Sequence, residues 1–262
     1  MTDDYFRRYL EIAPTTLALV RAIECRILSA IEFKPPILDI GCGDGVFAAQ
    51  FFEHQLDEGM DLDPKQVERA AKTGKYKIVR VADAKKLPYP DNSFNTVFSN
   101  CVFEHIPGIE SVLKEVNRVL RPGGRLIITV PSDKYGDNLL FTNIFRGFGL
   151  SGLGKWYTDK VNSMSFHVNL FGPDVWKEKL GHAGLTNMKA IPYLSPEATR
   201  LHDLMMLPGY FALKNRQYSQ KMILMKGLRT KVFVPILHSV FERFYLVDSD
   251  CGSSLIIIAE KP

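Results

Sequence analysis

The sequence of 262 residues predicts an α/β fold in which a mostly parallel sheet is covered by helices on both faces. Two observations support this prediction. From residue 37 to residue 131, short apolar runs alternate with amphipathic segments, which is typical of strands linked by helices. The first apolar run, at 37–40, leads into a glycine-rich turn, and a helical pattern begins directly after that turn.

Seven segments have the pattern of strands, and together they predict a seven-stranded, Rossmann-like sheet: 37–40, 58–62, 76–81, 94–99, 125–130, 186–191 and 254–260. The segments between them carry signals of helix boundaries. Asp63 can cap a helix that begins at Pro64, and Gly74 lies just past its end. Apolar residues from Ile109 to Leu120 recur on one helical face. A turn at 122–124 is expected before the fifth strand.

The chain divides into four predicted segments. Residues 1–36 form an N-terminal helical cap, and residues 37–194 form the ligand-binding core, with a loop insertion at about 135–165. Residues 195–250 form a helical insertion, or lid, and residues 251–262 contain the final core strand. The lid is expected because the stretch between the last two strands is too long for an ordinary connection.

The composition narrows the class of protein. Apolar residues make up 46% and charged residues 24% of the chain, as in soluble globular proteins, and a net charge of +4 neither requires nor excludes an acidic partner. The scattered cysteines form no CxxC pair, so we expect free thiols and neither a disulfide framework nor a metal site. The sequence has no apolar stretch typical of a secretory signal or membrane span, so a cytoplasmic location is expected.

The candidate ligand site begins at Asp39-Ile40-Gly41-Cys42-Gly43-Asp44-Gly45. Glycines in a turn between a strand and a helix let the backbone approach a ligand, and the helix beyond offers unpaired N–H groups. A dinucleotide-binding fingerprint would need a third glycine where Val46 stands. The spacing instead resembles the glycine loop of class I methyltransferases, which use S-adenosylmethionine (SAM).

Two further aspartates follow the next two strands. Asp61 can accept hydrogen bonds from both hydroxyls of a ribose, and its alternative role, capping a helix, suits Asp63 better. Asp83 can accept from an adenine amino group or, alternatively, from amides of its own turn. Because open parallel sheets bind ligands at the carboxyl ends of their strands, we expect Asp39, Asp61 and Asp83 to converge on one adenosyl group.

Ordered motifs between 37 and 132 resemble those of the SAM-dependent methyltransferases related to quinone and sterol methyltransferases (methyltransferase type 11). Besides the glycine loop they are Gly59-Met60-Asp61-Leu62-Asp63-Pro64, the run from Asp83 to Phe94, Glu104-His105-Ile106 and Leu120-Arg121-Pro122-Gly123-Gly124. One departure is Asn95, where the family usually has an aspartate in a mostly structural position.

The resemblance implies a Rossmann-like core that binds SAM and releases S-adenosylhomocysteine (SAH). It implies that the cofactor pocket is lined by Gly41, Gly43, Asp61, Leu62, Asp83, Ala84 and Asn100. We add Asp39 and Cys42 from the same loop, together with Phe47, although a phenylalanine in a helix is more often part of a core.

The sulfonium of SAM is already a strong methyl donor, so the protein mainly aligns the acceptor and excludes water. A base is needed only when the acceptor must lose a proton, and His105 is the candidate. The favoured alternative is that Glu104 and His105 cap or pack the following turn. His167 and Tyr135 are weaker candidates, and Asp133 is interpreted as a turn residue.

The acceptor is expected to be a small molecule, a lipid-like compound or a glycan. The basic, amphipathic segment 214–243 has two open interpretations: peripheral contact with a membrane or a lipid-linked substrate, or a lid whose apolar face packs on the sheet. A nucleic-acid methyltransferase ranks lower, because Ser99-Asn100-Cys101-Val102 stands where an Asn/Asp-Pro-Pro-aromatic motif is often found, so no nucleic-acid partner is expected. The third hypothesis is a SAM-binding protein without catalytic activity.

Overall fold

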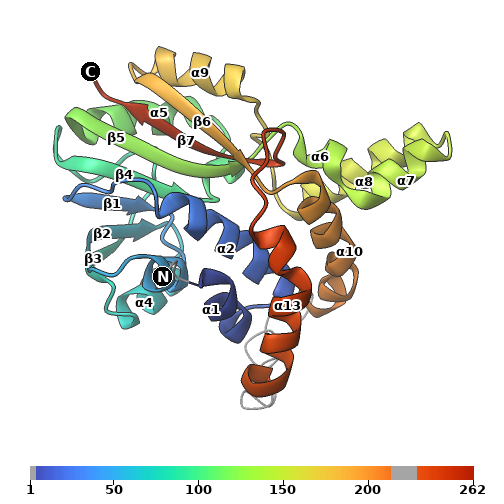
Figure 1. Cartoon of the computed structure of the whole chain (residues 1–262). Coiled ribbons are helices and arrows are strands. Elements are labelled where there is room, and N and C mark those ends of the chain that lie inside the picture. The colour runs from blue at the N-terminus through green and yellow to red at the C-terminus, as the bar shows by residue number, and fades with distance from the viewer. Residues whose placement is uncertain (1–3, 214–228) are drawn as a thin grey trace. The chain divides into compact units, whose positions relative to one another are not determined.

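The computed structural model describes residues 4–213 and 229–262 and confirms the predicted α/β fold (Figure 1). Its seven strands lie in the order β3-β2-β1-β4-β5-β7-β6. Strands β1 to β5 pair in parallel, and β7 runs antiparallel to β5. The bounds are β1 (Ile37–Ile40), β2 (Leu56–Asp61), β3 (Tyr76–Val81), β4 (Phe94–Asn100), β5 (Leu120–Pro131), β6 (Thr186–Tyr193) and β7 (Ser254–Glu260).

Contacts divide the chain into two compact units. The sheet unit comprises residues 32–133, 162–192 and 254–262, and the helical unit comprises residues 1–31, 134–161 and 193–253. The helical unit holds α1 (Tyr5–Ile12), α2 (Thr15–Leu28), α6 (Tyr135–Asn138), α7 (Leu140–Gly147), most of α8 (Ser151–Met164), α10 (Pro196–Leu213), the π-helical turn η2 (Arg229–Phe233) and α13 (Val234–Tyr245). The four segments predicted from the sequence stay a prediction.

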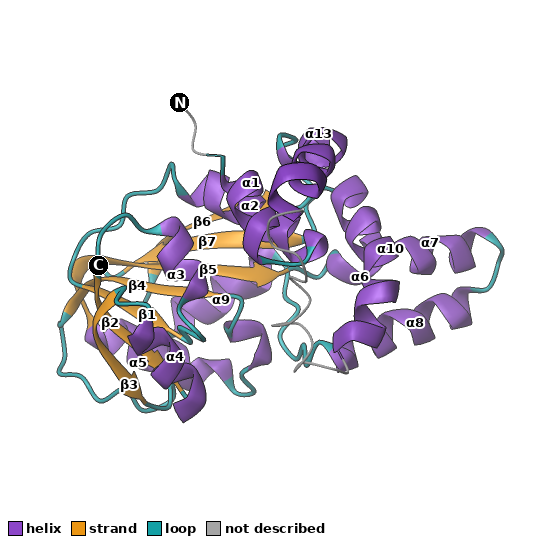
Figure 2. Ribbon diagram, turned by 90° about the horizontal axis from the view of Figure 1, so that it is seen from below, coloured by secondary structure: helices purple, strands orange, loops and turns teal. Residues whose placement is uncertain are grey.

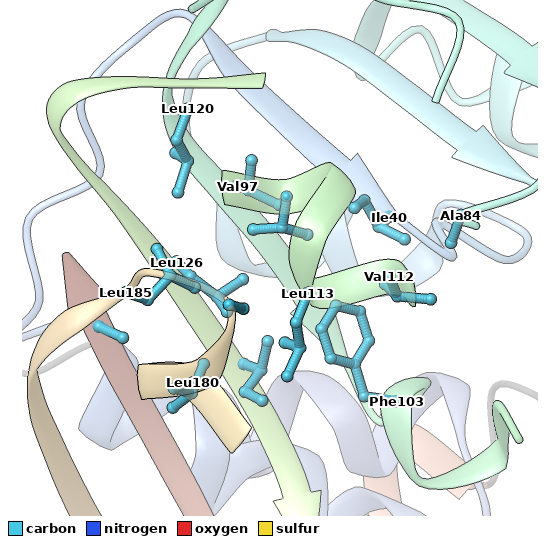
Figure 3. Packing of buried hydrophobic residues seen from close by; sticks show 14 of the residues in the cluster. Ile40, Ala84, Val97, Phe103, Val112, Leu113, Leu120, Leu126, Leu180 and Leu185 are labelled. Atoms are coloured by element: carbon cyan, nitrogen blue, oxygen red, sulfur yellow. The ribbon is translucent and has the colours of Figure 1, made fainter. Parts of the chain in front are cut away.

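Helices cover both faces of the sheet, and apolar side chains on each face form a core. On one face, β-strand residues such as Val97 and Leu126 pack with α5 (Ile109–Val119) and α9 (Pro173–His182) (Figure 3). On the other face, α3 (Val46–Phe51) and α4 (Pro64–Lys72) contribute Ala48 and Ala70 to a second cluster. Helix α4 begins as predicted, because the Asp63 carboxylate accepts from the Lys65 N–H at 2.9 Å.

The segment 135–165 is helical, which differs from the loop insertion expected from its glycines. Helices α7 and α8 lie side by side (Figure 2). The hydroxyls of Thr142 and Thr158 are 2.8 Å apart across their seam. A Cβ at Gly154 would lie 3.1 Å from the Thr142 carbonyl oxygen, so this glycine permits a close approach of the helices. Tertiary packing therefore overrides the weak helical propensity of the segment.

Strand β5 begins earlier than predicted and includes the expected turn at 122–124. The Gly123 N–H donates to the Lys261 carbonyl at 2.8 Å, and the Lys261 N–H donates to the Gly124 carbonyl at 2.9 Å. The backbone of 261 thus extends the β5–β7 ladder through the glycines, which sequence periodicity alone cannot reveal.

Candidate functional site

A pocket lies in the sheet unit where β1, β2 and β3 end. The strand order reverses at β1, which pairs with both β2 and β4, and open α/β sheets bind ligands beside such a reversal. The lining comes from the last residues of β1 and β2 and from the segments that follow β1 to β4: Ile40, Gly41, Met60, Asp61, Leu62, Ala82, Asp83, Ala84, Lys85, Val102, His105, Ile106 and Pro107.

The pocket brings together six of the residues predicted for the site: Gly41, Asp61, Leu62, Asp83, Ala84 and His105. Five others are not among the lining residues: Asp39, Cys42, Gly43, Phe47 and Asn100. Sequence reasoning missed Val102, Lys85 and Pro107, whose only signal was their position just after the third and fourth strands. The cofactor roles of all these residues stay predictions.

The carboxylate of Asp61 connects β2 to the glycine loop. Its Oδ2 accepts from the Gly43 N–H at 3.0 Å, and its Oδ1 accepts from the Asp63 N–H at 2.9 Å. Two backbone amides therefore fix the orientation of a carboxylate that lines the pocket. Gly43 thus helps to orient the carboxylate of Asp61, although Gly43 itself does not line the pocket.

Gly41 allows the glycine loop to pass close to Val102, in the segment that follows β4. Its φ of +75° is a left-handed conformation, and a Cβ there would lie 2.4 Å from Cγ2 of Val102. Only glycine meets both requirements without displacing the pocket wall. The structure therefore gives a steric reason for the first glycine of the motif.

Asp39 lies beneath the loop, in the core. It is 4% exposed, and its Oδ2 accepts a 2.7 Å hydrogen bond from the hydroxyl of Tyr76 on β3. Burial raises the pKa of the Asp39 carboxyl to about 7, and the hydrogen bond from Tyr76 opposes part of this shift. The Tyr76 ring passes over Gly59, where a Cβ would lie 2.7 Å from the ring.

Asp83 makes the turn contact of its alternative interpretation and also lies in the pocket wall. Its Oδ1 accepts from the Lys85 N–H at 2.9 Å, which is the turn geometry of the alternative interpretation. Asp83 also lines the pocket together with Ala84. The turn bond occupies one carboxylate oxygen and orients the group at the end of β3.

His105 lies at the end of the 3₁₀ turn η1 (Phe103–His105), in the pocket wall. Its Nδ1 is 3.1 Å from the carbonyl oxygen of Phe166, and because that oxygen can only accept, Nδ1 carries the proton. In the neutral ring, Nε2 then holds the lone pair. Nε2 is 3.7 Å from Oε1 of the buried Glu104.

The segment 166–169 forms hydrogen bonds with the backbone of this turn. The buried carboxamide of Asn169 donates to the carbonyls of Phe103 and Ile106, both at 2.7 Å. The rings of His105 and His167 stack with their centres 5.7 Å apart. Burial lowers the pKa of His167 to about 4, and the nearby His105 contributes to the same shift. Asn169 carried no sequence signal, since its contacts are more than sixty residues distant.

The remaining candidates have contacts outside the pocket lining. The Asn100 amide donates to the Thr129 hydroxyl at 2.7 Å, and the Phe47 ring stacks on Phe98 with centres 5.8 Å apart. Tyr135 is buried in the helical unit. The departure at Asn95 has a structural explanation, because its amide donates to the Pro35 carbonyl at 2.6 Å.

Known proteins match the part of the chain that builds this pocket. Residues 38–128 match the model of the family described as "Methyltransferase domain". A 27-O-demethylrifamycin SV methyltransferase of Amycolatopsis mediterranei is 39% identical over 35% of this chain and 37% of its own length. A sterol 24-C-methyltransferase of Gibberella zeae is 39% identical over 36% of this chain and 27% of its own. A ubiquinone/menaquinone biosynthesis C-methyltransferase of Desulfotalea psychrophila is 33% identical over 45% of this chain and 51% of its own length.

A solved structure covers nearly the whole chain but shows the fold alone. It is a SAM-dependent methyltransferase, possibly acting on histamine by its description, from Thermotoga maritima, with a TM-score of 0.58, 17% identity and coverage of 99% of this chain and 95% of that one. The chain spans between about a quarter and a half of the length of each of the curated relatives named above. Residues 38–128 thus match the methyltransferase family that the glycine loop and the strand-end aspartates predict, and the whole chain shares its fold with a solved SAM-dependent methyltransferase.

Proposed function

We propose that this chain transfers a methyl group from SAM to a small-molecule or lipid-like acceptor. The observation that carries the proposal is the pocket itself, in which a glycine loop and two strand-end carboxylates meet. Asp61 can accept from ribose hydroxyls, since amides hold its carboxylate at the pocket. Asp83 can accept from the adenine amino group, and the backbone of Gly41 leaves room where a side chain would meet Val102.

These residues fit the cofactor of the family chemically. The hydroxyls and the amino group of SAM donate hydrogen bonds, and the two carboxylates only accept. The apolar side chains of Ile40, Met60 and Ile106 offer an adenine ring a nonpolar surface. When bound, SAM supplies an electrophilic methyl group on a positively charged sulfur.

The protein residues have to position an acceptor and exclude water. His105 lines the same pocket with Nδ1 bonded to the Phe166 carbonyl, so in its neutral form Nε2 can take a proton from an acceptor hydroxyl or amine. With an acceptor that needs no deprotonation, His105 would only line the pocket. Whether His105 acts as a base therefore depends on the acceptor.

The acceptor class rests on the relatives, whose names specify sterol, quinone and rifamycin-type compounds. We propose a cytoplasmic protein that contacts membranes peripherally through 214–243. In the described part of this segment, Phe233, Ile236 and Val240 lie exposed at helical spacing, and Lys231 and Arg243 are exposed cations. Arg229 begins η2, and four further basic residues of the segment, Lys214, Arg216, Lys221 and Lys226, lie outside the described residues. None of the described helices is long and apolar enough to cross a bilayer.

Cofactor binding is tested by calorimetric titration of the full chain with SAH. We expect Asp61→Ala to weaken binding ~10-fold or more, since two hydrogen bonds to a carboxylate are lost. Asp63→Ala is the matched control, because Asp63 is two residues away, caps α4 and does not line the pocket. Equal affinities of wild type and Asp61→Ala for SAH would refute this cofactor site.

Acceptor class is tested separately with isotopically labelled SAM and a cell extract. Label in organic-soluble compounds supports the proposal, and label in RNA supports the nucleic-acid alternative. If SAH binds but no acceptor is labelled, the chain is a SAM-binding protein without transferase activity.

A further inference from the structure

A second feature of the molecule, unrelated to the pocket, is the helical hairpin formed by α7 and the first part of α8 in the helical unit (Figures 1 and 2). We define its tip by the apolar side chains Phe148, Leu150, Leu153 and Trp156. All four are exposed, Phe148 by 79% and Trp156 by 59% of its surface. Large aromatic side chains are seldom left so exposed in a cluster without a partner.

The tip is not needed to hold the hairpin together, because the seam between the helices uses other residues. Phe141 and Phe145 pack edge-on against Tyr157, with ring centres 5.6 and 6.2 Å apart. The base is anchored by the buried Asp203 of α10, which accepts from the Tyr157 hydroxyl at 2.6 Å and from the Phe141 N–H at 3.1 Å.

The charges around the tip select one class of partner. From residue 138 to residue 158 the chain contains no acidic residue, whereas Arg146 and Lys155 lie within it and Lys160 follows one turn after Trp156. Arg146 pairs with Asp137 at 2.9 Å and Lys155 pairs with Asp159 at 2.6 Å, so Lys160 leaves the segment 137–160 with a net charge of +1. An apolar tip with a net positive charge is complementary to a bilayer with anionic head groups.

A second copy of the chain fits less well. In a symmetric self-contact, the same patch meets itself, so the net positive charge of 137–160 in one copy would approach that of the other. Phe148 and Leu150 also flank Gly149, whose φ of +76° turns the chain, so they project at a narrow tip and not from a broad face.

We infer that the α7–α8 hairpin is a membrane-docking element, in which Phe148, Leu150, Leu153 and Trp156 insert among the head groups of an anionic lipid bilayer. Aromatic and leucine side chains suit this depth, because Trp places its ring in the interface and its N–H can meet water or head groups. The inference does not depend on methyl transfer, and it concerns a different segment from 214–243.

The experiment is co-sedimentation of the full chain with vesicles of phosphatidylcholine containing phosphatidylglycerol, with pure phosphatidylcholine vesicles in parallel. We expect binding to the anionic vesicles and a loss of at least ~10-fold in partitioning for the double variant Phe148→Ser/Trp156→Ser. The matched control is Leu17→Ser/Leu204→Ser, which removes two exposed apolar side chains outside the hairpin and outside 214–243, and Ile236→Ser/Val240→Ser in α13 tests the proposed contact through 214–243 in parallel. SAH affinity and thermal unfolding should stay unchanged in the hairpin variant, which separates docking from folding and from the pocket.

Fluorescence provides a second, local measurement. The chain has two tryptophans, and Trp176 is fully buried, so a blue shift on adding vesicles reports on Trp156. Trp156→Phe should abolish the shift and keep most of the binding. The inference is overturned if wild type ignores anionic vesicles, if only the α13 variant loses binding, or if sedimentation shows a dimer that the hairpin variant dissociates.

Discussion

The hydroxyl of Tyr76 donates a 2.7 Å hydrogen bond to Oδ2 of Asp39, and both residues are buried beneath the glycine loop. Gly59 leaves the space that the tyrosine ring occupies. Three neighbouring strands, β1, β2 and β3, therefore meet in one contact below the pocket. The aspartate that opens the glycine motif thus acts in this structure by supporting the loop from the core.

This contact predicts a pH dependence of stability. Because the pKa of Asp39 is raised to about 7 in the folded protein, against about 3.9 in an unfolded chain, the folded state holds this proton more tightly between those values. The contribution of Asp39 therefore lowers the free energy of unfolding as pH rises from about 4 to about 7. Asp39→Asn removes this dependence and should be more stable than wild type at pH 8, by on the order of 4 kcal/mol.

Urea denaturation at several pH values measures this difference. The gap between Asp39→Asn and wild type should be small near pH 4 and should widen toward pH 7. Tyr76→Phe serves as the companion variant, since it leaves the carboxyl buried without its donor. A gap that does not change with pH would show that Asp39 is not the titrating group.

The two glycines of the loop should differ in their tolerance of a methyl group. Gly41→Ala combines a strained φ with a contact of 2.4 Å to Val102, whereas Gly43→Ala has a φ of +54° and no atom within 4 Å of its Cβ. We expect Gly43→Ala to lower the free energy of unfolding by about 1 kcal/mol, from backbone strain alone. Gly41→Ala should cost more and should also weaken SAH binding.

The double variant Gly41→Ala/Val102→Ala separates the two contributions. Removing the valine methyl groups should recover the part of the loss that comes from the clash and leave the part that comes from φ. If Val102→Ala rescues nothing, the steric explanation of Gly41 is wrong.

Asn169 should act as a positioning residue for the His105 turn. Its carboxamide donates to the carbonyls of Phe103 and Ile106, so Asn169→Ala leaves two acceptors without this donor and should cost about 1–3 kcal/mol of unfolding free energy. Asn169→Asp should be worse, because ionised carboxylate oxygens cannot donate to carbonyl oxygens. Denaturation and SAH titration measure both effects, and Asn143→Ala, which loses two similar bonds at a half-buried side chain, is the control.

His167 should titrate well below the range of an exposed histidine. Burial and the nearby His105 lower its pKa to about 4, so the unfolded chain binds this proton more tightly between about pH 4 and 6.5. Stability from this residue is therefore present above pH 6.5 and lost as the pH falls toward 4. Nuclear magnetic resonance titration of the imidazole protons tests the value, and His167→Gln should flatten the acid side of the stability profile.

The sheet was predictable because its signals are local. Each strand is a short apolar run, and Asp63 and Pro64 mark the start of α4 within two residues. The convergence of Asp61 and Asp83 at the pocket followed from a rule of open parallel sheets. What local patterns could not supply were contacts between distant residues.

Asp39 illustrates that limit. The sequence places it at a strand end like Asp61, but Asp39 is level with Gly59, two residues before Asp61, and Tyr76, 37 residues away, donates to its buried carboxyl. The hairpin at 140–161 illustrates it again, because Thr142, Thr158 and Asp203 stabilise helices in a stretch whose glycines predict a loop. Asn169 is a third example, because it donates to the carbonyl of Phe103 in η1, 66 residues away.

The insertion of β7 between β5 and β6 has a consequence for how the protein is made. Ser254 to Glu260 pair with Pro131 to Arg125, so the ribosome synthesises β7, which lies between β5 and β6, more than a hundred residues after β5. Until then, β5 presents an open edge of unpaired amides and carbonyls, the kind of surface that attracts chaperones or aggregates. Nascent chains halted before residue 254 should therefore remain protease-sensitive, however well the glycine loop and its aspartates are already formed.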